Sequence, residues 1–128
     1  MIVWLVLLNL SNHPCSSWPE TQRQSATEQF GDIEDMPFPQ IPPEADADDV
    51  RQIVEGYEGQ IRKLAADDPS LTVHLMGELT FTHLLVNRLH TAGIPCVAST
   101  SERIVLQEAN GKKTSQFKFV RFRGYAKT

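Results

Sequence analysis

The sequence lacks the features that define several large classes of protein. It has only two cysteines, Cys15 and Cys96, with no C-x-x-C pair or zinc-type His/Cys spacing, so neither a disulfide framework nor a zinc centre is expected. There is no G-x-G-x-x-G fingerprint, Walker loop or H-E-x-x-H helix. We therefore expect free thiols, no metal and no bound cofactor.

Long apolar runs and an excess of positive charge are also missing. Residues 1–10 are apolar but make up about half of the roughly 20 residues that a membrane-spanning helix needs. They also lack the basic start and cleavage pattern of a signal peptide. The formal net charge of −4 gives the whole chain no attraction for duplex nucleic acid. The sequence predicts a cytoplasmic protein that binds neither membranes nor duplex nucleic acid.

The remaining composition is typical of one globular domain of 128 residues, with 41% apolar and 22% charged residues. Charge is unevenly distributed, because residues 112–127 carry six Lys or Arg and no acid. This basic segment has two interpretations. It lines an anion site, or it is an edge strand whose charges oppose aggregation.

Strand and helix patterns alternate along the chain. Apolar runs predict strands at 2–10, 32–38, 71–76 and 94–98, helical spacing predicts helices at 19–30, 46–64 and 79–92, and Asn110-Gly111 predicts a hairpin between 104–108 and 114–123. The order predicts an α/β fold: a single Rossmann-like domain over residues 1–128, with a mostly parallel sheet, helices on both faces and a C-terminal β-hairpin. Ligands of such sheets bind beyond the carboxyl ends of the strands, which selects three polar loops.

The first loop follows the most apolar strand and contains Asn9, Ser11, Asn12 and His13. Its amides, hydroxyl and imidazole can hydrogen-bond to a phosphate or a ribose. Short polar side chains also form Asx-type turns that cap a following helix, so a purely structural role is the alternative.

The second loop joins a strand to a helix through Gly77, so that backbone N–H groups at the helix start can approach an anion. Glu78 is a candidate acceptor for a ribose hydroxyl, and Thr80 is a weaker candidate ligand. The alternative role of Glu78 is to cap the helix, and we regard this loop mainly as an anion shelf.

The third loop carries the strongest local signal. Ser99, Thr100, Ser101, Glu102 and Arg103 place hydroxyls beside a guanidinium, and an arginine fork is suited to phosphate. The alternative is a surface ion pair between Glu102 and Arg103. We rank this loop first and the Asn9 loop second as phosphate or ribose contacts.

The histidines show no metal-binding pattern. His83 and His90 are expected on the polar side of a helix. His74 projects from a strand, where a core or edge position is more common than a role as a ligand. Any reaction is therefore expected to be metal-independent and centred on phosphate.

Four segments of the chain resemble small CRISPR-associated proteins of type III systems. They are Asn-Leu-Ser-Asn-His-Pro at 9–14, His-Leu-Met-Gly-Glu at 74–78, Ala-Ser-Thr-Ser-Glu-Arg at 98–103 and Phe-Lys-Phe-Val-Arg-Phe-Arg at 117–123. These proteins are stand-alone relatives of the CRISPR-associated Rossmann fold (CARF), and some of them are ring nucleases. The resemblance implies a CARF-like homodimer that binds a cyclic oligoadenylate second messenger across its two-fold axis.

The resemblance also implies an activity. A ring nuclease would cleave the messenger, with cyclic tetra-adenylate as the expected substrate, and switch off antiviral signalling. The route is attack of a ribose 2′-hydroxyl on the neighbouring phosphate. In this interpretation Arg103 stabilises the charge on the phosphate, Ser11 and Thr100 hold it, and Asn12 orients a ribose.

The acid or base is less well defined by the sequence, with His13 and Glu102 as the candidates. Because no clear general base is present, a second hypothesis is a module that binds the messenger without cleaving it. A third hypothesis, independent of the resemblance, is a generic nucleotide-binding Rossmann-like scaffold.

Overall fold

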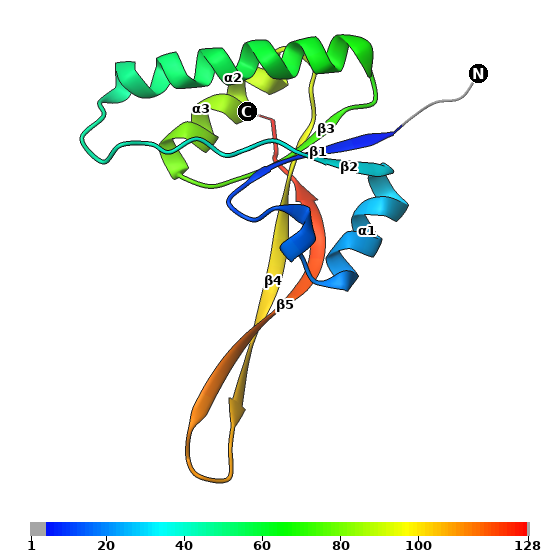
Figure 1. Cartoon of the computed structure of the whole chain (residues 1–128), viewed down its shortest axis with the longest axis vertical. Helices are drawn as coiled ribbons and strands as arrows, with labels where there is room; N and C mark the ends of the chain where they lie inside the picture. The colour runs from blue at the N-terminus through cyan, green and yellow to red at the C-terminus, as the bar shows by residue number, and fades with distance from the viewer. Residues whose placement is uncertain (1–4, 128) are drawn as a thin grey trace.

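Strands and helices alternate along residues 5–127, the part of the chain that the computed structural model describes (Figure 1). In chain order the elements are β1 (Val6–Ser11), the short 3-10 turn η1 (Cys15–Ser17), α1 (Glu20–Phe30), β2 (Asp32–Asp35), α2 (Ala47–Asp67), β3 (Thr72–Met76), α3 (Leu79–Thr91), β4 (Cys96–Gln107) and β5 (Lys113–Gly124). The predicted α/β fold is confirmed. Residues 2–4 of the expected first strand lie outside the described residues.

The strands form one sheet in the order β2-β1-β3-β4-β5. The first four strands run parallel, and β5 is antiparallel to β4. The chain leaves β1 toward β2 on one side and later returns to β3 on the other side. Strand order therefore reverses between β1 and β3, and the carboxyl ends of these two strands form the crevice where doubly wound sheets bind ligands.

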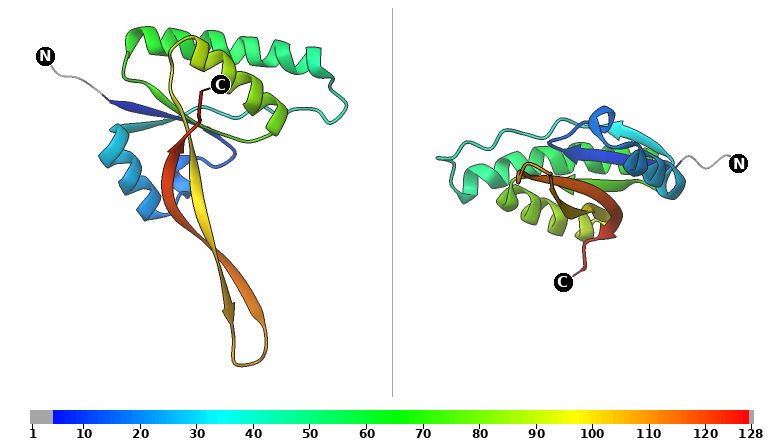
Figure 2. Two further views of the ribbon diagram at one scale, coloured as in Figure 1. Left: turned by 180° about the vertical axis from the view of Figure 1, so that it is seen from behind. Right: turned by 90° about the horizontal axis from the view of Figure 1, so that it is seen from below.

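Helices cover both faces of the sheet, as Figures 1 and 2 show. Leu8 and Leu10 belong to the core that α2 and α3 complete, whereas Leu7 belongs to the core beneath α1 with Trp18. Successive side chains of a strand point to opposite faces, so a strand covered on both sides is apolar at every position. This explains why the first strand reads as a continuous apolar run.

Local signals set the ends of the helices. Asp46 and Asp49 form a capping box at the start of α2. Gly93 adopts a φ of 78° just after α3, in the left-handed region that glycine favours. Across residues 5–127 we find no helix with both the length and the apolar character needed to cross a membrane.

The last two strands continue beyond the sheet as a two-stranded ribbon (Figures 1 and 2). The hairpin around Asn110-Gly111 is confirmed, with Gly111 at a φ of 84°. The predicted loop at 99–103 is wrong, because β4 runs without interruption from Cys96 to Gln107. β5 pairs with β4 from Val97 to Gln107 and provides partners for its backbone hydrogen bonds. Polar side chains therefore do not end the strand there. The ribbon is irregular once, between Thr100 and Ser101.

Candidate functional site

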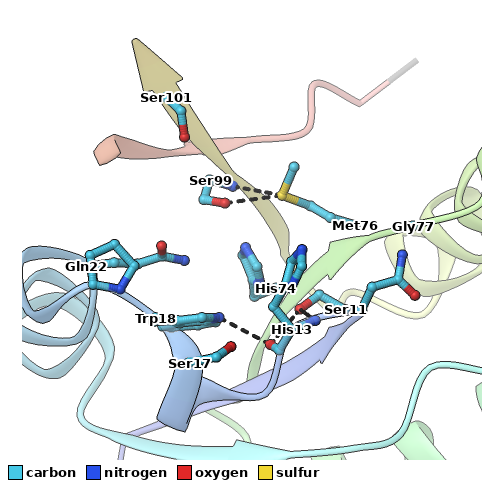
Figure 3. Close-up of a pocket in the computed structure, with 12 residues that line it drawn as sticks. Ser11, His13, Ser17, Trp18, Gln22, His74, Met76, Gly77, Ser99 and Ser101 are labelled. Carbon is cyan, nitrogen blue, oxygen red and sulfur yellow. Dashed lines mark hydrogen bonds between the residues drawn. The ribbon is translucent and has the colours of Figure 1, made fainter. Parts of the chain in front are cut away.

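A cavity of about 510 Å³ lies where the order of strands reverses (Figure 3). It is formed by the carboxyl ends of β1 and β3, the inner part of β4 and the start of α1. The residues that line it are Ser11, Asn12, His13, Ser17, Trp18, Pro19, Gln22, His74, Met76, Gly77, Ser99 and Ser101. Members of all three predicted loops are thus brought together, and their lining side chains are mostly hydroxyls, amides and imidazoles.

The centre of the site is a chain of hydrogen bonds from Asp35 through Asn9 to His74. The amide Nδ2 of Asn9 donates to Asp35 Oδ1 at 2.9 Å and to the carbonyl of His13 at 2.8 Å. Its Oδ1 lies 2.9 Å from Nδ1 of His74 and accepts from the Ser11 hydroxyl at 2.8 Å. Asn9, expected to contact a ligand, is buried and instead orients its neighbours.

This network determines where the proton of His74 lies. Both amide hydrogens of Asn9 are donated elsewhere, so its Oδ1 is the acceptor that faces the imidazole. Nδ1 of His74 must then carry the proton, and Nε2 keeps a free lone pair. The ring presents an acceptor, not a donor, at its far end.

Nε2 of His74 is buried and has no hydrogen-bond partner among the described residues. The side chain is 2% exposed, and burial lowers the pKa of His74 from 6.5 to about 4, so the ring is neutral at physiological pH. An unsatisfied buried polar atom costs about 1 to 3 kcal/mol. A ligand hydroxyl or N–H group that reached this nitrogen would recover that energy.

Aromatic side chains hold the imidazole in place. The rings of Trp18 and Phe122 pack edge-on against His74, with centroids 5.1 and 5.6 Å away. Nε1 of Trp18 donates to the carbonyl of His13 at 3.1 Å, the same carbonyl that accepts from Asn9. The loop backbone is therefore fixed, while the side chain of His13 is exposed and lines the cavity (Figure 3).

Asp35 anchors the outer end of the chain of hydrogen bonds. Its Oδ1 also accepts from the backbone N–H of Cys15 at 3.0 Å. Partial burial raises the pKa of Asp35, but the hydrogen bonds from Asn9 and from Cys15 outweigh this effect and lower it overall. The carboxylate therefore stays ionised and keeps accepting from Asn9.

The opposite wall of the cavity comes from β3 and β4. The backbone N–H and the hydroxyl of Ser99 lie 3.2 and 3.1 Å from the sulfur of Met76. Ser101 follows two residues later on the same face of the strand. Thr100 points the other way and donates to the carbonyl of Arg121, so it is not part of the cavity.

Glu102 and Arg103 lie farther along the ribbon and do not line the cavity. The guanidinium of Arg103 donates to the Ser115 hydroxyl at 3.0 Å. Neighbouring residues of a strand point to opposite faces, and no ion pair links Glu102 to Arg103 within residues 5–127. Alternate residues of a strand point to the same face, so Arg103 shares its face of β4 with Ser99 and Ser101. It lies two residues beyond Ser101, outside the cavity lining, and its guanidinium is held by Ser115.

The backbone N–H groups at the start of α3, which were predicted to bind an anion, are instead bonded to the carboxylate of Glu78. The carboxylate of Glu78 accepts from the backbone N–H groups of Phe81 and Thr80 and from the Thr80 hydroxyl. These bonds lower the pKa of Glu78, and the bond from the backbone N–H of Phe81 has the largest effect. Phe38 covers Gly77 so closely that a Cβ there would lie 2.2 Å from its ring. Glu78 therefore caps the helix, and Thr80 supports the cap.

Two further hollows adjoin the main cavity. One of about 390 Å³ is bordered by Asn9, Ser11 and Asp35, and one of about 650 Å³ by Phe38 and Glu78. Asn12 lines both of these and the main cavity. The carboxyl edge of the sheet is thus hollowed over a wider area than the main cavity alone.

Sequence reasoning missed His74, Trp18, Gln22, Met76 and Asp35. His74 is the one histidine in a strand of otherwise buried residues, which was the available signal. Asp35 is the last residue of β2, which pairs with β1. This pairing could not be known before the order of the strands was known. The two buried partners of this network meet across 65 residues of sequence.

No group of three or more His, Cys, Asp or Glu suited to a metal ion occurs in the described part of the chain. No curated protein and no solved structure matches the chain significantly. A family model described as the uncharacterized protein MJ1673 family matches residues 5–123, which include every residue that lines the cavity, all of β4 and all of β5 except Gly124. The chain belongs to the uncharacterized protein MJ1673 family.

Proposed function

We propose that this protein binds a cyclic oligoadenylate at its carboxyl-edge cavity and opens the ring by metal-independent attack of a ribose 2′-hydroxyl on the neighbouring phosphate. Two observations support the proposal. Three of the four segments that resemble type III CRISPR-associated ring nucleases, at 9–14, 74–78 and 98–103, contribute residues to the lining of this cavity. The unpaired Nε2 of His74, which carries most weight, is an acceptor suited to a hydroxyl donor such as the 2′-OH of RNA.

The lining of the cavity suits one nucleotide unit. The hydroxyls of Ser11, Ser99 and Ser101 and the amide of Asn12 can hydrogen-bond to a phosphate or a ribose. The indole of Trp18 offers an aromatic surface at the same site. A volume of about 510 Å³ lies in the range of small-ligand sites and holds roughly one nucleotide. The rest of a ring would lie over the neighbouring hollows and beyond the rim, toward Arg103.

The reaction requires three changes at one phosphate. The 2′-oxygen forms a bond to phosphorus as its proton leaves, the bond from phosphorus to the 5′-oxygen breaks, and the 5′-oxygen gains a proton. The products are a 2′,3′-cyclic phosphate and a 5′-hydroxyl on an opened chain. Alignment of the attacking oxygen and stabilisation of the charge supply most of the rate enhancement.

The two histidines have different roles in this scheme. With a pKa of about 4, His74 is a weak base at neutral pH, so it positions the 2′-hydroxyl by accepting its hydrogen bond. His13 is in contact with solvent at the cavity and is the candidate to take up and return the proton. Arg103 is the candidate to stabilise phosphate charge.

Incubation of labelled cyclic tetra-adenylate and hexa-adenylate with excess protein in EDTA tests the proposal. The expected result is a linear product with a 2′,3′-cyclic phosphate, identified by mass spectrometry. A His74→Phe variant, which keeps a ring in the same place, should lose the activity. His83→Phe, on the exposed side of α3, should retain it. Rings that remain intact after hours contradict the cleavage reaction.

A second candidate function is binding without cleavage. It is favoured by the low basicity of His74 and by a cavity whose lining, within the described residues, includes no Lys or Arg. Tight binding of the ring with no turnover would select it. A flat calorimetric trace with both rings would instead favour a generic nucleotide-binding scaffold.

A further inference from the structure

Charge is separated between two parts of this chain. Residues 96–127, which form the ribbon and the tail, contain seven Lys or Arg and two Asp or Glu, a net charge of +5. Residues 1–95 contain five Lys or Arg and fourteen Asp or Glu, a net charge of −9, and the two values sum to the −4 of the whole chain. Figures 1 and 2 show the positive ribbon projecting away from the helices.

The ribbon also exposes apolar side chains. Phe117 is 72% exposed, Val120 56%, Val105 53% and Leu106 44%. Two-stranded ribbons that stay in solvent usually carry charged or polar residues at such positions, because exposed apolar strands associate with other chains. Lysines and arginines alone would suit an edge strand that avoids contacts, but Phe117, Val105 and Leu106, all in the outer part of the ribbon, indicate a surface that is covered.

The register shows which side of the ribbon is open. Paired residues of antiparallel strands share a face. Ser99 pairs with Phe122, and Ser101 pairs with Phe119, on the face that α1 and the cavity cover. The next pair on this face, Arg103 with Phe117, is exposed, and Val105 with Ser115 follows it. The inner half of this face is packed and the outer half is uncovered.

We propose that the outer half of the ribbon, residues 103–117, docks on the acidic body of a second copy of this chain, and that each copy does so to the other. This outer half carries three Lys or Arg and one Glu, a net charge of +2, so two ribbons placed together would bring like charges against each other, as would two bodies of −9. Opposite charges meet only when the ribbon of one copy contacts the body of the other copy. A two-fold axis allows both contacts to form at once and closes the assembly as a dimer.

Single-stranded nucleic acid is the competing partner, because basic grooves with aromatic side chains bind it. The ribbon offers one exposed aromatic ring, Phe117, and its other exposed apolar side chains are aliphatic and give no stacking surface. The observations therefore favour a second copy of the chain. This inference does not depend on ring opening, because Arg103 is the one residue of the segment that the proposed site also uses, and none of the variants that test the dimer alters it.

The mass of the full chain in solution, measured by light scattering across protein concentrations, tests the inference. At low salt we expect twice the 14.4 kDa mass of one chain. Because the contact pairs opposite charges, raising the salt concentration should weaken the dimer. Phe117→Ser and the double variant Lys112→Glu with Lys113→Glu, all within residues 103–117 and all exposed, should each raise the dimer dissociation constant tenfold or more.

Two controls keep the outcome interpretable. Leu79→Ser removes an apolar side chain that is 81% exposed on α3, and Lys63→Glu adds negative charge to the body, so both should leave the dimer intact. Circular dichroism checks that each variant is folded. A monomer at every concentration overturns the inference, and so does a dimer that the ribbon variants do not weaken. A monomer that binds an oligoadenylate RNA through Phe117 assigns the ribbon to nucleic acid instead.

Discussion

Nδ1 of His74 lies 2.9 Å from Oδ1 of Asn9, and the same asparagine donates to Asp35, so three residues from three neighbouring strands act as one unit. The unit fixes the imidazole with its proton toward β1 and its lone pair on the opposite nitrogen. A buried acceptor without a partner is rare in folded proteins and marks the place where a ligand donor would be stabilised.

Asn9→Ala should destabilise the protein by about 2 to 4 kcal/mol, since it removes bonds to His74, Asp35 and the carbonyl of His13 and leaves buried groups unsatisfied. Urea unfolding monitored by circular dichroism measures the change. The control is Asn12→Ala, three residues later and just after β1, whose exposed side chain should matter by less than about 0.5 kcal/mol. Equal effects of the two variants would show that the Asn9 network is not structural.

Stability should fall as the pH is lowered from about 6.5 to about 4. Burial lowers the pKa of His74 in the folded state, so the unfolded chain takes up this proton first and protonation favours unfolding across that window. Above pH 6.5 the contribution is fully present, and its loss should approach about 3 kcal/mol. Denaturant titrations at several pH values measure it. The His74→Phe variant should show a flatter profile, and an unchanged profile would contradict a buried neutral imidazole.

Gly77→Ala should destabilise the protein by about 1 to 3 kcal/mol, because the added Cβ would overlap the ring of Phe38 and displace it from Phe81. Gly59→Ala is the matched control. A Cβ at Gly59 meets nothing within 4 Å, and alanine favours the interior of a helix, so α2 should gain up to about 1 kcal/mol. Thermal unfolding of both variants shows whether each substitution raises or lowers the stability. A Gly77→Ala variant of unchanged stability would mean that Phe38 does not pack against residue 77.

Arg103→Ala should weaken binding of cyclic tetra-adenylate about tenfold, which corresponds to the loss of one charge-assisted phosphate contact. Arg103 follows Ser99 and Ser101 on the cavity face of β4, whereas Arg123 pairs with Ala98 on the other face. Arg123→Ala, which removes the same charge from the same ribbon, should therefore have a smaller effect. Isothermal calorimetry gives both constants, and equal losses would point to a general effect of charge.

Much of the fold could be predicted because each signal was local. The continuous apolar run of β1, the capping acids of α2 and the Asn-Gly turn specify their structures within a few residues. The extent of β4 could not be predicted, because Ser99 to Arg103 remain in a strand only through pairing with β5. Polar residues in a two-stranded ribbon carry no periodic apolar signal of their own.

The candidate site was predictable only in part. Ser11, His13, Gly77 and Ser99 follow from the rule that ligands bind at strand ends, and all four line the cavity. The role of His74 depends on a hydrogen bond to Asn9 across the sheet, which no local pattern encodes. Arg103 was placed at the site because it was expected in a loop; the continuous strand carries it past the rim.

Nitrogen NMR of the histidine side chains, with the full chain titrated with cyclic tetra-adenylate and with its 2′-deoxy counterpart, tests the central claim most directly. Both rings carry the same phosphates and bases, but only the RNA ring has the hydroxyl that Nε2 of His74 would accept. We expect the RNA ring to shift the Nε2 resonance of His74 while Nδ1 stays protonated, and the deoxy ring to leave that resonance unchanged. An unperturbed His74 in the presence of bound RNA ring, or equal shifts with both rings, would contradict this claim.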